Sequence, residues 1–169
     1  MRKFLLISIL VISYSSYAES NACLRTKYVK YAEAKTEYQR SLTELISRNH
    51  PELSDVATIY MHDQLLRIDR TLLTFNYLVQ DKPDLINTSK TIDMWINLNK
   101  DIESEIAAID KSYSNLLQEI ELSCSRAVHP DGDLLRKVMR ENIMLLPEFL
   151  TITEQLTNAT EKLDATMCQ

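Results

Sequence analysis

The chain has 169 residues, a formal net charge of −5 at pH 7 and a single glycine, Gly132. Glycine supplies tight turns and the backbone N–H cradles that bind phosphate, so its scarcity argues against nucleotide-binding loops. Nucleic acid is excluded as an expected partner, because phosphate neutralisation needs clustered Lys and Arg on a basic surface.

The first 18 residues have the pattern of a secretory signal peptide. Arg2 and Lys3 give a positive start, and residues 4–12 form a nearly continuous apolar run. A Ser-Tyr-Ala triplet ending at Ala18 then supplies the small side chains that signal peptidase requires. We therefore predict a cleaved signal peptide, a periplasmic or secreted protein, and no stable membrane insertion after cleavage.

Two alternatives to simple cleavage stay open at this point. An uncleaved anchor is one, although the apolar run is short for a bilayer span. Lipidation at Cys23 is the other, although no aliphatic residue stands three positions before it. Removal of 18 of the 169 residues leaves enough chain for one continuous core and too little for two ordinary domains. We predict a single helical-bundle domain over residues 19–169.

Two amphipathic helices are predicted in the first half of this domain. Apolar and aromatic residues recur at spacings of three and four between residues 24 and 48, which is typical of one helical stripe. The sequence Asn-His-Pro at 49–51 ends that helix. A second helix is expected from residue 53 to 80, and its wide apolar arc indicates that it is the most buried one.

Two longer helices are predicted in the second half. A heptad-like stripe from Ile92 to Cys124 predicts one continuous helix of nearly forty residues. The turn signal His-Pro-Asp-Gly-Asp at 129–133 precedes a last helix that runs close to the C-terminus. Pro147 is expected to kink or interrupt that helix near Ile143, because proline removes a backbone donor and clashes with the preceding turn.

Four amphipathic helices joined by short turns favour an all-α fold, an antiparallel up-down-up-down four-helix bundle whose last helix is kinked near Pro147. An exported chain with three cysteines is expected to form one disulfide, while three free thiols would be the expectation for a reducing compartment. The up-down topology places Cys23 and Cys168 at one end and Cys124 at the other, which predicts a Cys23–Cys168 disulfide. If Pro147 reverses the chain instead, Cys168 returns towards Cys124.

A polar cluster is predicted around the second helix. His62, Asp69 and Asn76 recur every seven residues within its apolar arc. Counting back from the turn places Tyr38 near His62, and Lys35 within one turn of both His62 and Asp69. These residues form a candidate ligand-binding site with a Lys35–Asp69 ion pair. The competing interpretation is a buried polar layer that fixes the register of the helices.

A partner surface is predicted from the mismatch in helix lengths. The longer third and fourth helices would project beyond the four-helix section and leave apolar side chains uncovered. The candidate surface consists of Leu117, Ile120, Val138, Met139, Ile143 and Met144, together with Leu116. The alternative is that the first two helices shift to cover these side chains. The coiled-coil-like stripes would also allow a homodimer.

The sequence contains no HExxH, Glu-x-x-His or GxSxG motif and no paired histidines, so we expect no enzyme, no metal and no cofactor. The first hypothesis is an exported helical bundle that acts through protein–protein contacts, as an inhibitor or immunity protein, a chaperone or an accessory of an envelope machine. The alternative is a small-molecule or cofactor carrier with a polar pocket around His62 and Asp69. An enzyme that uses the same cluster is a third reading.

Overall fold

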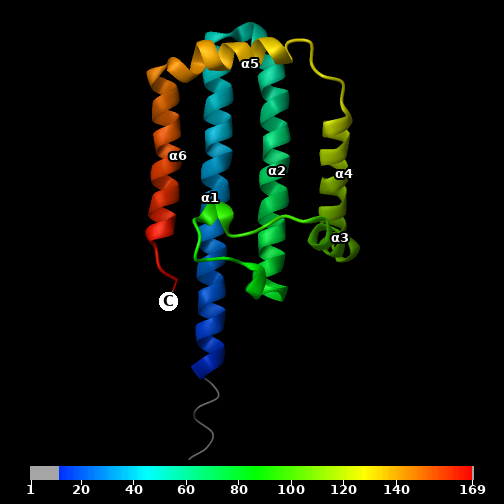
Figure 1. Cartoon of the computed structure of the whole chain (residues 1–169), viewed down its shortest axis with the longest axis vertical. Coiled ribbons are helices and arrows are strands. Elements are labelled where there is room, and N and C mark those ends of the chain that lie inside the picture. The colour runs from blue at the N-terminus through cyan, green and yellow to red at the C-terminus, as the bar shows by residue number, and fades with distance from the viewer. Residues whose placement is uncertain (1–11, 169) are drawn as a thin grey trace, which may run out of the picture.

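The computed structural model describes residues 12–168, with side chains from residue 21 onward. This part of the chain contains helices and no strand, in agreement with the predicted fold class (Figure 1). Its six α-helices are α1 (Ile12–Asn49), α2 (Ser54–Asp81), α3 (Lys100–Ile109), α4 (Lys111–Ser125), α5 (Gly132–Glu141) and α6 (Pro147–Ala165). Its 3₁₀ helices are η1 (Pro51–Leu53), η2 (Pro83–Leu85), η3 (Ile92–Met94) and η4 (Ile143–Leu145). Residues 1–11 of the predicted signal peptide lie outside the described residues.

Helices α1 and α2 form an antiparallel hairpin that is the most extensive contact in the structure. Both were predicted from apolar spacing. The turn between them follows from Pro51, which occupies the first turn of η1, where its missing N–H costs nothing. Leu45 and Ile46 at the end of α1 pack there against Leu53 and Val56, and all four side chains are buried.

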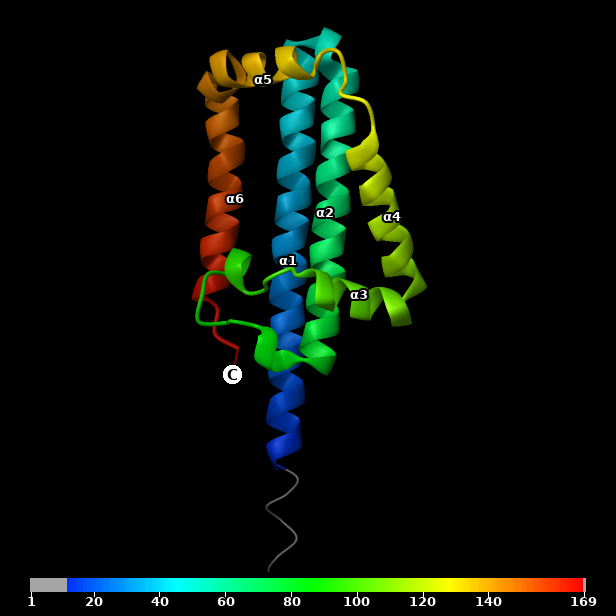
Figure 2. The ribbon, with the colours of Figure 1, turned by 45° about the vertical axis from the view of Figure 1, so that its right-hand side comes forward.

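Helices α6 and α4 lie on opposite sides of this hairpin (Figures 1 and 2). Helix α6 packs against α1, and α4 packs against α2. The chain directions alternate as predicted, but the lateral order is α6, α1, α2, α4. A closed four-helix bundle is therefore not confirmed, because closure would bring the first and last of these helices together.

The prediction of one continuous helix from Ile92 to Cys124 is wrong. The segment 82–99 crosses the face of the α1–α2 hairpin (Figure 2), and α3 and α4 are separated at Asp110. Asp110 has an extended backbone, and its Oδ1 accepts from the backbone N of Ser112 at 2.8 Å. Asn99 caps α3 in the same way, with Oδ1 2.9 Å from the N of Ile102. Short polar side chains that satisfy free N–H groups start new helices, so they break the apparent heptad stripe.

The predicted interruption near Ile143 is confirmed, and it removes the projecting hairpin. Helix α5 crosses the end of the α1–α2 hairpin, η4 follows, and Pro147 begins α6 (Figure 2). Ile143 is fully buried in the cluster that contains Leu45 and Leu53. Because of this break, α5 and η4 lie across the turn end of the α1–α2 hairpin and do not project beyond it.

A second core cluster lies at the other end of the hairpin. Tyr28 of α1 stacks on Phe75 of α2 with ring centroids 3.9 Å apart, and Trp95 from the crossing segment lies 6.0 Å from Phe75. All three side chains are buried. Burial raises the pKa of Tyr31, which packs beside Tyr28, to about 12.

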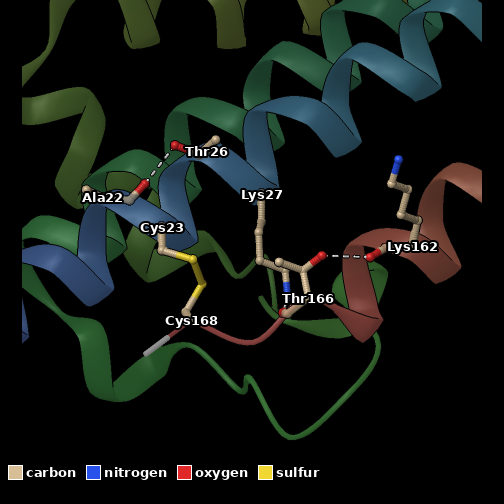
Figure 3. Close-up of a disulfide and its surroundings, with 7 residues drawn as sticks. All are labelled: Ala22, Cys23, Thr26, Lys27, Lys162, Thr166 and Cys168. Carbon is tan, nitrogen blue, oxygen red and sulfur yellow. Dashed lines mark hydrogen bonds between the residues drawn. A yellow bond between two sulfur atoms is a disulfide. The ribbon is translucent and has the colours of Figure 1, made fainter.

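The chain ends are joined next to this cluster. Cys23 of α1 and Cys168, which follows α6, lie at disulfide distance with a Cα–Cα separation of 5.6 Å (Figure 3). Cys124 is free and exposed at the end of α4. The predicted Cys23–Cys168 pairing is therefore the one that the structure forms.

This disulfide is expected to stabilise the fold strongly, because it links residues 145 positions apart and restricts the unfolded chain. We expect Cys168→Ser to lower the free energy of unfolding by about 2–5 kcal/mol, measured by denaturant titration of oxidised protein. Cys124→Ser is the matched control and should leave stability unchanged. Equal losses in the two variants, or a linked peptide containing Cys124 in non-reducing mass mapping, would contradict the pairing.

Candidate functional site

The predicted polar cluster on α2 does not face the interior. His62 and Asp69 are exposed, and Nε2 of His62 lies 3.5 Å from Oε1 of Glu119 on α4. The buried side chains of α2 are centred on the opposite side of the helix and include Val56, Ala57, Thr74, Phe75, Leu78 and Val79. Apolar residues occur almost all round α2, so their spacing alone did not determine which side meets the core.

The α1 members of that cluster are also arranged differently from the prediction. Lys35 and Tyr38 are half-buried. The ammonium group of Lys35 lies 5.5 Å from the ring centroid of Tyr31. Within the described residues, Lys35 forms no ion pair with Asp69, so the structure does not assemble the four predicted side chains into a pocket.

The predicted partner surface is also divided between core and solvent. Ile120 and Ile143 are buried. Leu117 packs in the cluster formed with Tyr113, and Val138 and Met139 pack against the α1–α2 turn. Of the six predicted residues, Met144 is the exposed one.

Met144 belongs to a different apolar surface, at the bend between α5 and α6. We call it the α5–α6 corner and define it by Met144, Leu145 and Leu150, which are 46%, 72% and 56% exposed. Ile143 and Leu146 beside them pack into the core. The corner therefore presents three large apolar side chains on a backbone that is fixed from below.

A groove of about 420 Å³ lies at the opposite end of α6, next to the disulfide. Each of its two walls is one face of a helix, with side chains at positions i, i+3, i+4 and i+7. The lining residues are Cys23, Thr26, Lys27 and Lys30 of α1, and Ala159, Lys162, Leu163 and Thr166 of α6 and its C-cap. Figure 3 shows the disulfide, Lys27, Lys162 and Thr166 at this end of the chain. We call the groove lined by these eight residues the α1–α6 groove.

Lys27 is the buried member of the α1–α6 groove, with only 7% of its surface exposed. Its Nζ donates to the carbonyl oxygen of Thr166 at 2.7 Å and lies 5.0 Å from the ring centroid of Trp95. Thr166 stands at the C-terminal end of α6, where the backbone carbonyls carry partial negative charge. A carbonyl, a helix terminus and an aromatic face thus compensate this buried charge.

The crossing segment is held against the same place. Oδ1 of Asp164 on α6 accepts from the backbone N of Ile92 at 2.9 Å. Nε1 of Trp95 donates to the carbonyl oxygen of Lys90 at 3.0 Å. The crossing segment therefore contacts both helices that form the α1–α6 groove, α6 through Asp164 and α1 through Lys27.

Sequence reasoning missed this groove, although one signal for it was present. Basic side chains outnumber acidic ones by six to three over residues 24–50, in an otherwise acidic chain. Which helix would lie beside them could not be derived from spacing, because it depends on the lateral order of the helices.

A third polar feature joins α2 to the short helices. The hydroxyls of Thr74 and Tyr113 lie 2.8 Å apart in the core, and Nη1 of Arg70 lies 3.5 Å from Oε1 of Glu103. Burial raises the pKa of the Tyr113 hydroxyl. These contacts attach α3 and α4 to α2.

The described residues hold no group of three or more His, Cys, Asp or Glu side chains placed to bind a metal ion. None of the helices in that range is sufficiently long and apolar to span a bilayer. Comparison with family models, curated proteins and solved structures finds no match to this chain.

The placement of His62 and Asp69 on the surface has a direct consequence for stability. We expect His62→Ala and Asp69→Ala each to change the free energy of unfolding by less than about 0.5 kcal/mol, as is usual at exposed positions. Phe75→Ala, on the buried side of the same helix, should cost about 3–5 kcal/mol. Denaturant titrations of the three variants check this. A loss above about 2 kcal/mol in either polar variant would instead support the interpretation that these side chains form a buried polar layer.

Proposed function

We propose that the chain is an exported helical protein that acts by binding a protein partner through the α5–α6 corner. Two features support export. Residues 1–18 have the signal-peptide pattern, and the Cys23–Cys168 pair fits an oxidising compartment, where disulfides persist.

The observation that carries the binding proposal is the exposure of Met144, Leu145 and Leu150 at one bend. Large apolar side chains that gather on a surface mark interaction sites, because water contact is unfavourable for each of them. Charged residues flank the corner, with Arg140 and Glu148 both exposed. An apolar centre with a charged rim is the usual anatomy of a protein interface.

The rigidity of the corner favours recognition of a specific partner. Ile143 and Leu146 anchor the bend in the core, so little conformational entropy is lost when a partner docks. An inhibitor or immunity protein, a chaperone and an accessory of an envelope machine all need such a surface. The α5–α6 corner supports this class of function and does not select among its members.

The alternative function, a small-molecule carrier, is not supported at the site predicted for it. It required a polar pocket inside the bundle around His62 and Asp69, and both side chains are exposed.

A substitution pair tests the proposal. Leu145→Ser combined with Leu150→Ser removes two exposed corner side chains without opening the core. The matched control is Ile109→Ser combined with Leu122→Ser, which removes two side chains of α3 and α4 that are at least 70% exposed. The tagged proteins are isolated gently from the exporting cell and weighed by native mass spectrometry.

We expect the wild type and the control to carry a stoichiometric second protein, and the corner variant to retain about tenfold less of it. The proposal fails if the corner variant keeps its partner, or if the control loses it to the same extent. A mass corresponding to two copies of this chain would replace the separate partner with a homodimer.

A further inference from the structure

We propose that the α1–α6 groove binds a small amphiphile that has one apolar chain and an anionic headgroup. This site is separate from the α5–α6 corner, and the inference does not depend on the protein partner.

The charge of the groove is opposite to that of the chain. Three lysines, Lys27, Lys30 and Lys162, belong to its lining, which contains no carboxylate, whereas the whole chain has a net charge of −5. None of the three forms an ion pair with a carboxylate of the described residues. A group of cations without ion-pair partners attracts a complementary anion.

The three lysines have different roles. Lys27 is buried, and its bond to Thr166 places its charge against the negative end of α6. Lys30 on α1 and Lys162 on α6 are exposed. One ammonium group therefore remains available on each wall of the groove to contact a headgroup.

The rest of the lining is suited to an alkyl chain. Ala159 and Leu163 supply apolar side chains, and Thr26 and the lysine stems add methyl and methylene groups. The volume of about 420 Å³ lies within the range of small-molecule pockets. An apolar lining with cationic side chains fits a molecule with an apolar chain and a charged end better than it fits a bare ion.

The groove is fixed before any ligand arrives. The disulfide at Cys168 holds the segment that follows α6, and the bond from Lys27 fixes Thr166 two residues earlier. Figure 3 shows the disulfide, with Lys27 and Thr166 drawn beside it. A preformed site loses little binding free energy to reorganisation.

Two headgroups have the required chemistry. A carboxylate carries one negative charge, and a phosphate monoester carries between one and two at pH 7. The ammonium groups of Lys30 and Lys162 act as two point charges, so they select a headgroup by its charge and not by its planar geometry. The phosphate monoester is therefore expected to bind more tightly than the carboxylate.

Isothermal titration calorimetry on the purified, oxidised protein tests the proposal with four probes: octyl phosphate, octanoate, octanol and inorganic phosphate. The two anionic amphiphiles should bind, and octanol and inorganic phosphate should each bind at least about tenfold more weakly than octyl phosphate. Tighter binding of octanoate than of octyl phosphate would still support an anionic amphiphile and would identify a carboxylate headgroup.

The location is tested with two double variants of equal charge. Lys30→Gln with Lys162→Gln removes both available cations of the groove and should weaken octyl phosphate binding by at least about tenfold. Lys100→Gln with Lys137→Gln removes two exposed cations that do not line the groove and should leave the affinity unchanged.

Three results would overturn the proposal. One is the absence of binding to the wild type, and another is an equal loss of affinity in the two double variants, which would indicate attraction by net charge alone. The third is octanol binding as tightly as octyl phosphate, because the lysines would then contribute nothing. The fluorescence of Trp95, the one tryptophan of the chain, gives a second signal, since Lys27 lies over its ring.

Discussion

The stacking of Tyr28 on Phe75 is the contact on which the rest of the structure depends. It joins α1 to α2 at the open end of the hairpin, opposite the turn, where the two long helices would otherwise separate. Trp95 packs on the same pair and positions the crossing segment. Through Lys27 and the backbone of Ile92, the segment and α1 then hold the end of α6. Aromatic burial and stacking supply the stabilisation, and the polar contacts set the positions of the attached elements.

The hairpin therefore serves as a spine with a helix on each side, and this arrangement explains where surfaces remain available. Helix α6 lies on the opposite side of the hairpin from α4, has its most extensive contact with α1, and contributes no fully buried residue. Leu150 near its start belongs to the α5–α6 corner, and Leu163 and Thr166 at its other end line the α1–α6 groove. Figure 1 shows the two ends of this helix. The two proposed sites thus lie at opposite ends of one helix, and substitutions can separate them.

The sequence predicted the elements whose signals are local and did not predict the choices that depend on neighbours. Helices α1 and α2, the break at Pro147 and the Cys23–Cys168 pairing followed from spacing, turn residues and chain direction. The stripe from Ile92 to Cys124 was misread as one helix. Asn99 was taken for a polar residue within a heptad, although it caps α3, and the cap at Asp110, which lies beside the stripe, was missed. His62 was misplaced because α2 is apolar on several sides, and aromatic packing at Phe75 decides which side is buried.

Amide hydrogen exchange, followed residue by residue, tests the central role of the Tyr28–Phe75 contact most directly. If this contact is central, amides of α1 near Tyr28 and of α2 near Phe75 exchange only through global unfolding. Amides of α4 then exchange earlier, because α4 separates from α2 while the hairpin stays folded. Equal protection of α4 and α2 would contradict this account, because it would indicate a closed bundle that unfolds as one unit.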